Sequence, residues 1–101
     1  MRLKSGATNV SSSGTAVRLS NTNEIVTRIY LSTPTGNTSV VYFGDSTVEG
    51  SSGVSGLIII KGTAPTEVNF SKDGKGGIQF KELWVDAATN GDDLMWLAVI
   101  E

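Results

Sequence analysis

The chain has 101 residues, with 8 basic and 10 acidic side chains, a formal net charge of −2, and neither histidine nor cysteine. This length suits one domain, and the acidic balance leaves no basic surface for a phosphate backbone, so we expect no nucleic-acid partner. Without histidine and cysteine, the usual general base near neutral pH, thiolate metal ligands and disulfides are all missing. We therefore expect no enzyme activity, no catalytic residues, no metal site and no cofactor. The longest apolar run, residues 94–100, is too short to cross a membrane.

Residues 1–15 contain few apolar side chains and include a Ser-Ser-Ser-Gly run. This composition is typical of a terminal segment outside a folded core. We interpret residues 1–15 as an extended N-terminal arm, either loosely packed or ordered on a neighbouring subunit, and residues 16–101 as the folded domain. Removal of residues 1–14 should then leave folding intact.

From residue 16 onward, short apolar runs alternate with turn residues, and no segment shows a sustained helical period. The expected strands are residues 16–20, 24–33, 38–44, 57–60, 66–70 and two runs within residues 78–101. The clearest alternation places Ile25, Thr27, Ile29 and Leu31 on one side of a strand. Glycine- and serine-rich stretches at residues 45–56 and 71–77 are expected to be loops.

Three expected strands, residues 40–43, 57–60 and 94–100, are apolar on both sides. An antiparallel sheet in an isolated sandwich usually buries only one face, so these runs leave apolar surface to be covered. Either loops and the arm cover this surface, or other subunits do. We favour other subunits.

The strongest local signal lies near the C-terminus, where Asn90-Gly91 separates two apolar runs. Asn-Gly favours a two-residue turn because both central positions need a positive φ. We predict a β-hairpin in which Thr89 pairs with Asp92. One side of this hairpin is apolar throughout and should face the core, with Leu83, Val85 and Ala87 opposite Ala98, Trp96 and Leu94.

The other side of the predicted hairpin carries Glu82, Trp84 and Asp86 opposite Val99, Leu97 and Met95. This surface is too apolar for open water and too charged for a core, which is typical of a contact between subunits. We expect self-association, with a closed trimer as the preferred form. The candidate interface residues are Tyr42, Trp84, Met95, Leu97 and Val99.

Seven or eight strands at a spacing of roughly ten residues are typical of a β-sandwich or barrel. We predict an all-β fold, an antiparallel β-sandwich of seven to eight strands with the N-terminal arm extended from it. Eight strands would suit a jelly roll, although strand order cannot be read from one sequence.

Two further binding hypotheses stay open. Asp92 and Asp93 beside Asn90, or Asp45 with Glu49, could offer oxygen ligands to calcium, but no stretch has the spaced carboxylates of a calcium loop. Trp84 and Tyr42 could form a stacking platform for a carbohydrate, although aromatic side chains on strands more often serve packing.

Two segments resemble parts of small structural proteins of tailed bacteriophages and prophages: residues 41–48 (VYFGDSTV) and 83–92 (LWVDAATNGD). In those proteins a strand end of the first kind precedes a Gly/Ser-rich loop, and a hairpin of the second kind closes the chain. The resemblance extends over residues 16–101 and carries no catalytic residues.

The resemblance implies a virion component that is made in the host bacterial cytoplasm and lies on the capsid surface. The expected role is that of a decoration, or cement, protein, which binds the phage major capsid protein and stabilises the assembled head. The alternative is a head-fibre, tail or baseplate module that binds a host surface glycan or receptor.

Overall fold

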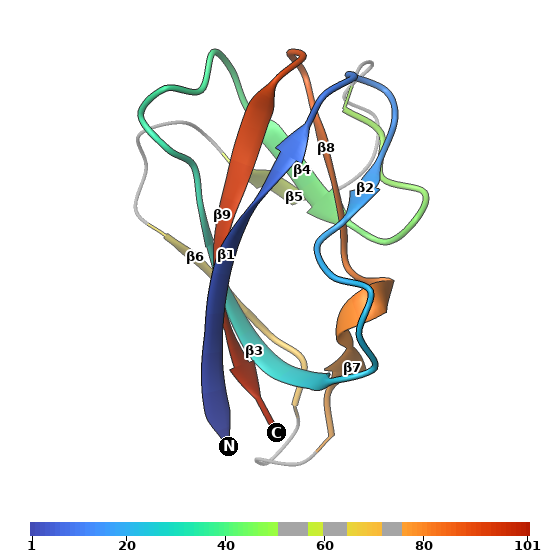
Figure 1. Cartoon of the computed structure of the whole chain (residues 1–101), viewed down its shortest axis with the longest axis vertical. Coiled ribbons are helices and arrows are strands. Elements are labelled where there is room, and N and C mark those ends of the chain that lie inside the picture. The colour runs from blue at the N-terminus through green and yellow to red at the C-terminus, as the bar shows by residue number, and fades with distance from the viewer. Residues whose placement is uncertain (51–56, 60–64, 72–75) are drawn as a thin grey trace.

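The computed structural model describes residues 1–50, 57–59, 65–71 and 76–101. Within these residues the chain forms nine β-strands and one short 3₁₀-helix, and the strands make two antiparallel sheets in a sandwich-like arrangement (Figure 1). The predicted all-β, antiparallel fold is confirmed. Nine strands are assigned where the sequence predicted seven or eight, and two of them, β2 and β7, are only two residues long.

The first sheet, called sheet A, contains the two longest strands side by side. Its spatial order is β1 (Arg2–Val10), β9 (Asp92–Ile100), β3 (Ile25–Ser32) and β6 (Thr66–Asn69). A further strand, β7 (Ile78–Gln79), pairs with the first residues of β3, whereas β6 pairs with later ones. All of these pairings are antiparallel.

The second sheet, called sheet B, is built from shorter strands. Its spatial order is β2 (Val17–Arg18), β8 (Trp84–Ala87), β4 (Val41–Gly44) and β5 (Leu57–Ile59). The 3₁₀-helix η1 (Phe80–Glu82) connects β7 to β8. Successive strands change sheet except from β4 to β5 and from β6 to β7, so the chain crosses the core repeatedly.

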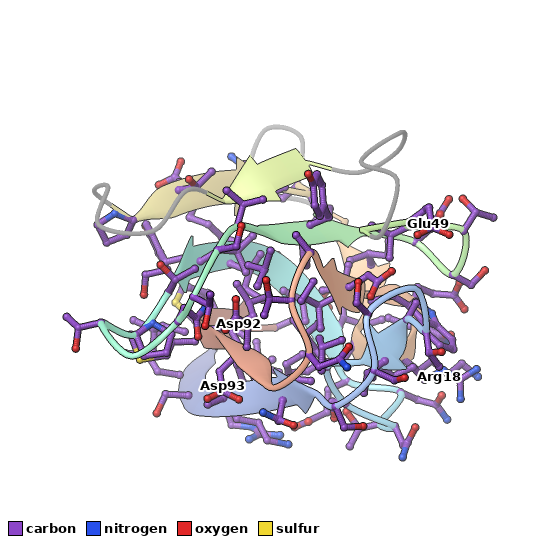
Figure 2. All side chains as sticks on the ribbon, turned by 90° about the horizontal axis from the view of Figure 1, so that it is seen from above. Arg18, Glu49, Asp92 and Asp93 are labelled. Atoms are coloured by element: carbon purple, nitrogen blue, oxygen red, sulfur yellow. The ribbon has the colours of Figure 1, made fainter. Side chains whose placement is uncertain are left out.

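The core lies between the sheets and draws side chains from both (Figure 2). Phe80 and Leu94 are among its largest fully buried side chains. Trp96 is 8% exposed and packs edge-on against Phe80, with ring centroids 5.0 Å apart. Its Nε1 also donates a hydrogen bond to Thr8 Oγ1 at 3.1 Å. The predicted place of Trp96 in the core is confirmed.

The prediction of an N-terminal arm is wrong, because β1 pairs with β9 over nine residues, from Arg2 opposite Ile100 to Val10 opposite Asp92. The strand escaped detection because it lies at a sheet edge and brings few apolar side chains to the core. Among its core-side positions, Gly6 lies under the ring of Trp96 and Lys4 binds Glu24 Oε1 at 3.0 Å. Removal of residues 1–14 would strip this strand, so folding is no longer expected to survive it.

The charged core-side positions of β1 also protect an exposed edge. Arg2 and Lys4 both form ion pairs with Glu24, and the Lys4 ammonium lies 5.8 Å from the centre of the Phe80 ring. Inward-pointing charges on an edge strand discourage pairing with the strand of another chain, because such pairing would bury them. The free edge of β1 is therefore a poor site for adding a strand.

The predicted hairpin is also wrong, although its turn is present. The amide of Asp92 donates to Thr89 O at 3.4 Å, and Gly91 has a φ of 87°. The two strands then part, since β8 pairs with β2 and β4 whereas β9 pairs with β1 and β3. The carboxylate of Asp92 accepts hydrogen bonds from the amides of Thr38 and Ser39, which ties the start of β9 to the segment before β4.

The side chains that were predicted to face the core do so in both strands, although the strands pair with other partners. Val85 and Ala87 of β8 are buried, as are Leu94, Trp96 and Ala98 of β9. The sequence placed these two sets side by side in one sheet. In the structure they face each other across the core, since each strand keeps its own alternation.

A β-bulge corrects the predicted faces of β3. The pairing of β3 with β9 shifts between Val26 and Arg28, so Thr27 is the extra residue. Such a residue moves every side chain before it to the opposite face. Val26 is therefore fully buried, whereas Ile25 and Thr27 are only half-buried.

Parts of three predicted segments lie outside the described residues. The strand predicted at residues 57–60 is β5 as far as Ile59, and residue 60 is not described. Residues 51–56 of the predicted loop and 72–75 of the predicted turn are likewise outside the description. Within the part of the chain that is described, no helix is long and apolar enough to cross a membrane.

Candidate interaction surface

The five candidate interface residues lie on opposite sides of the molecule. Met95, Leu97 and Val99 alternate with the buried residues of β9 and point outward from sheet A. Tyr42 and Trp84 belong to β4 and β8 of sheet B. The predicted cross-strand pairing of Trp84 with Leu97 is not formed, because the two residues lie in different sheets.

The two aromatic candidates in sheet B are already covered to a large extent within one chain. Tyr42 is 9% exposed. Trp84 is half-buried, and the guanidinium of Arg18 lies 4.9 Å from the centre of its ring, a cation–π contact between paired residues of β2 and β8. Neither side chain offers an open platform for a partner or a stacked sugar.

Asp86 shows how the chain covers the outer side of β8. Its side chain is fully buried, and its carboxylate accepts hydrogen bonds from the amides of Gly14, Gly50 and Ala87 at 3.1, 2.7 and 2.8 Å. Gly50 lies so close to this strand that an added Cβ would meet the backbone of Ala87 at 2.8 Å. At this place the chain's own loops cover the second side of sheet B.

The outer side of sheet A is different, because large apolar side chains remain in contact with solvent. Leu3 is 65% exposed, and Met95 and Leu97 are each 38% exposed. They lie on neighbouring strands, since Leu3 pairs with Val99 across β1 and β9, and Tyr30 of β3 pairs with Leu97. We call these five residues, Leu3, Tyr30, Met95, Leu97 and Val99, the apolar face of sheet A.

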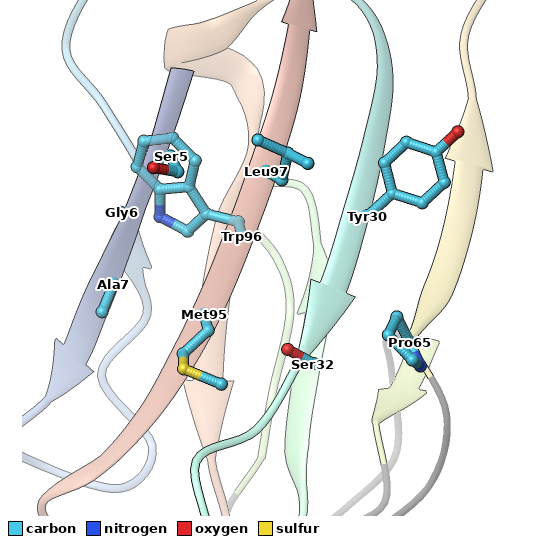
Figure 3. A pocket seen from close by; sticks show the side chains of 9 residues that line it. All are labelled: Ser5, Gly6, Ala7, Tyr30, Ser32, Pro65, Met95, Trp96 and Leu97. Carbon is cyan, nitrogen blue, oxygen red and sulfur yellow. The ribbon is translucent and has the colours of Figure 1, made fainter. Parts of the chain in front are cut away.

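This face is shallowly hollowed in two places. One depression of about 640 Å³ lies over the middle of the sheet, where Met95, Leu97, Tyr30 and Pro65 surround it (Figure 3). A second, of about 390 Å³, includes Leu3 and Val99 in its lining. Apolar side chains of a partner would fit the first depression, because its walls offer mainly apolar contact. The second is more polar, since Thr27, Arg28 and Glu101 also line it.

Two charged side chains, one on β3 and one on β6, lie beside the apolar face. Arg28 lies next to Val99 in the sheet, and Glu67 of β6 pairs with Tyr30. The hydrogen bond with Tyr30 and the negative charge of Glu67 raise the pKa of Arg28 above its ordinary value. The face therefore combines an apolar centre with a border that carries charged side chains, which is the usual anatomy of a protein–protein contact.

Two members of the apolar face were missed in the sequence. Leu3 lies in the segment that was interpreted as an arm, so its pairing could not be foreseen. Tyr30 could have been found, because the alternation that buries Ile29 and Leu31 places Tyr30 on the outer side of the same strand.

The acidic residues at the end of the molecule next to the β8–β9 turn serve as acceptors for the chain itself (Figure 2). Asp92 and Asp93 lie at the start of β9, away from Arg18 and Glu49 on the other side of the molecule. Asp92 binds two backbone amides, and Asp93 accepts a hydrogen bond from Asn9 Nδ2 at 2.7 Å. Among the described residues, no three acidic side chains gather into a possible metal site.

Comparison of the chain with protein-family models, with curated proteins and with solved structures finds no match. The apolar face of sheet A is therefore interpreted from its own geometry.

Proposed function

We propose that this chain is a structural protein of a tailed-phage virion, a decoration protein that binds the major capsid protein and stabilises the assembled head. The observation that carries the proposal is the apolar face of sheet A, whose exposed leucine and methionine side chains lie on paired strands rather than on loops. A face of this kind needs a partner, because a monomeric protein rarely leaves several large apolar side chains together in water.

The proposal includes assignment of the fold to the jelly-roll class of β-sandwiches. Its support is the nested pairing of β1 with β9, β2 with β8, β3 with β6, and β4 with β5. This is the pairing order that results when a long antiparallel ribbon wraps into two sheets, and jelly rolls are common in viral capsid proteins. The short β7 then counts as an addition at the edge of β3.

We assign the apolar face of sheet A to contacts between copies of the chain in a trimer. A closed ring buries the same face on every copy and suits positions of local three-fold symmetry on a capsid. A trimer also presents three head-binding surfaces together, so weak single contacts add up to strong attachment. The virion surface is the proposed location, after synthesis in the host bacterial cytoplasm, with no role for nucleic acid or membrane.

Sedimentation of the protein with expanded heads that lack it tests this function. The wild-type chain should pellet with the heads, and Leu97→Asp should stay in the supernatant because a charge at the centre of the face breaks the trimer. The control is Thr35→Asp, which adds the same charge at an exposed position between β3 and β4. Equal binding of all three proteins would contradict the assigned face. No binding to heads, together with binding to a host surface glycan, would instead support a head-fibre, tail or baseplate module.

A further inference from the structure

The turn between β8 and β9 contains the only Asn-Gly pair in the sequence, Asn90-Gly91. Both residues are exposed. Asparagine followed by glycine is chemically labile, because glycine has no side chain to hinder attack by its own backbone nitrogen on the asparagine amide. Asparagine is accordingly among the thermolabile residues of proteins.

Three hydrogen bonds from one short segment hold this pair. The amide of Gly91 donates to Val10 O at 2.7 Å, and the amide of Ser13 donates to Asn90 Oδ1 at 2.7 Å. The side chain of Asn9 donates from Nδ2 to Gly91 O at 2.8 Å. Residues 9–13, at the end of β1 and just after it, therefore clamp both reacting groups of the labile pair.

We propose that Asn90 is a deamidation site that the native fold keeps closed. In the reaction, the nitrogen of Gly91 attacks Cγ of Asn90, the side-chain nitrogen leaves as ammonia with the proton from Gly91, and a five-membered succinimide forms. Water then adds to one of the two ring carbonyls and opens the ring. The product is aspartate or, when the other ring bond breaks, isoaspartate.

The clamp opposes the first step at both reacting atoms. Gly91 must give up a proton that is now held in the hydrogen bond to Val10 O. The amide of Asn90 must turn toward Gly91, but its oxygen is held by Ser13. A hydrogen bond of ordinary net strength corresponds to about a tenfold change in an equilibrium constant, so the two bonds together should slow deamidation about a hundredfold.

Once the clamp has opened and Asn90 has reacted, the aspartate or isoaspartate product remains in the turn. The product places another carboxylate beside Asp92 and Asp93, which adds repulsion between like charges at this end of the molecule. Isoaspartate also lengthens the backbone of the turn that carries the chain from sheet B to sheet A. The modification would therefore mark those chains whose clamp has opened.

The test follows the rate of deamidation at Asn90 in the full-length protein, by peptide mass mapping and isoaspartate detection in mildly alkaline buffer. The native protein should react about a hundredfold more slowly than the protein unfolded in urea. Asn9→Ala removes the bond to Gly91 O, which anchors residues 9–13 on the turn without contacting either reacting group. The two bonds at the reacting groups should then open more often, and the native reaction should speed up by up to about tenfold while circular dichroism shows an intact fold. The control is Asn23→Ala, at an exposed asparagine between β2 and β3, and it should leave the rate unchanged.

Equal rates in the native and urea-unfolded proteins would overturn the proposal, and this comparison does not depend on any variant folding. An unchanged rate in folded Asn9→Ala would also overturn the role given to the clamp.

Discussion

The ring of Trp96 joins β9 to η1 and β1 through contacts of two kinds. It packs edge-on against Phe80 and donates a hydrogen bond to Thr8. Trp96→Ala should lower the free energy of unfolding by about 3–5 kcal/mol, because the change leaves a cavity and an unpaired hydroxyl in the core. Trp84→Ala should cost much less, because its half-buried ring leaves no enclosed cavity. Urea denaturation measures the free energy of unfolding of both variants. Equal decreases in the two variants would contradict this description of the core.

Gly6 gives a second test at the scale of single residues. A Cβ at this position would lie 2.8 Å from Cζ2 of Trp96, so Gly6→Ala forces the indole or β1 to move. We expect a loss of about 1–3 kcal/mol, as for other overpacked cores. Gly36→Ala is the matched control, because an added Cβ there meets nothing within 4 Å. If Gly36→Ala lowers the free energy of unfolding as much as Gly6→Ala does, the close approach of Gly6 to Trp96 does not explain the effect.

At the scale of elements, Asp86 ties three segments together. Its carboxylate accepts amides from the β1–β2 connection, from the segment after β4 and from β8 itself. Asp86→Ala leaves the amides of Gly14 and Gly50 without this acceptor and should cost about 2 kcal/mol or more. Asp45→Ala should change stability far less, because Asp45 is exposed and its carboxylate accepts hydrogen bonds from Thr47, only two residues away. Thermal unfolding of the two variants measures the difference, and equal melting temperatures would rule out the joining role.

Alternation along single strands could be predicted from the sequence, but partners between strands could not. The outward positions of Met95, Leu97 and Val99 follow from the period of two in β9 alone. The Asn90-Gly91 signal located a turn, but a turn signal does not say whether the next strand joins the same sheet. The partners of β9 are β1 and β3, and Asp92 at its start binds an amide 54 residues away in the chain. Contacts between segments so far apart leave no local signal in the sequence.

The edge strand β1 marks a second limit of prediction from the sequence. Its stability comes from backbone pairing with β9 and from ion pairs with Glu24, neither of which leaves an apolar pattern. The full extent of the apolar face, which includes Leu3, was hidden for the same reason. Hydrogen bonds between distant segments, such as those of Asp86, leave no local pattern either.

At the scale of the whole molecule, the proposed trimer depends on the apolar face of sheet A and not on the outer side of sheet B. Leu97→Asp should turn a trimer into a folded monomer in sedimentation equilibrium, because Leu97 lies at the centre of the apolar face of sheet A. Trp84→Ala should remain a trimer, because its ring lies in sheet B under Arg18. A wild-type chain that stays monomeric at high micromolar concentration would contradict the trimer. Dissociation by Trp84→Ala alone would move the contact to sheet B.

Heat-induced DNA release from phage heads tests most directly the proposal that the apolar face of sheet A makes this protein a stabiliser of the head. Heads lacking the protein are supplied with wild-type protein, Leu97→Asp, Thr35→Asp or buffer, and DNA release is followed by dye fluorescence as the temperature rises. Wild-type protein and Thr35→Asp should raise the release temperature, whereas Leu97→Asp should behave like buffer. Release at one temperature in all four samples would contradict the claim.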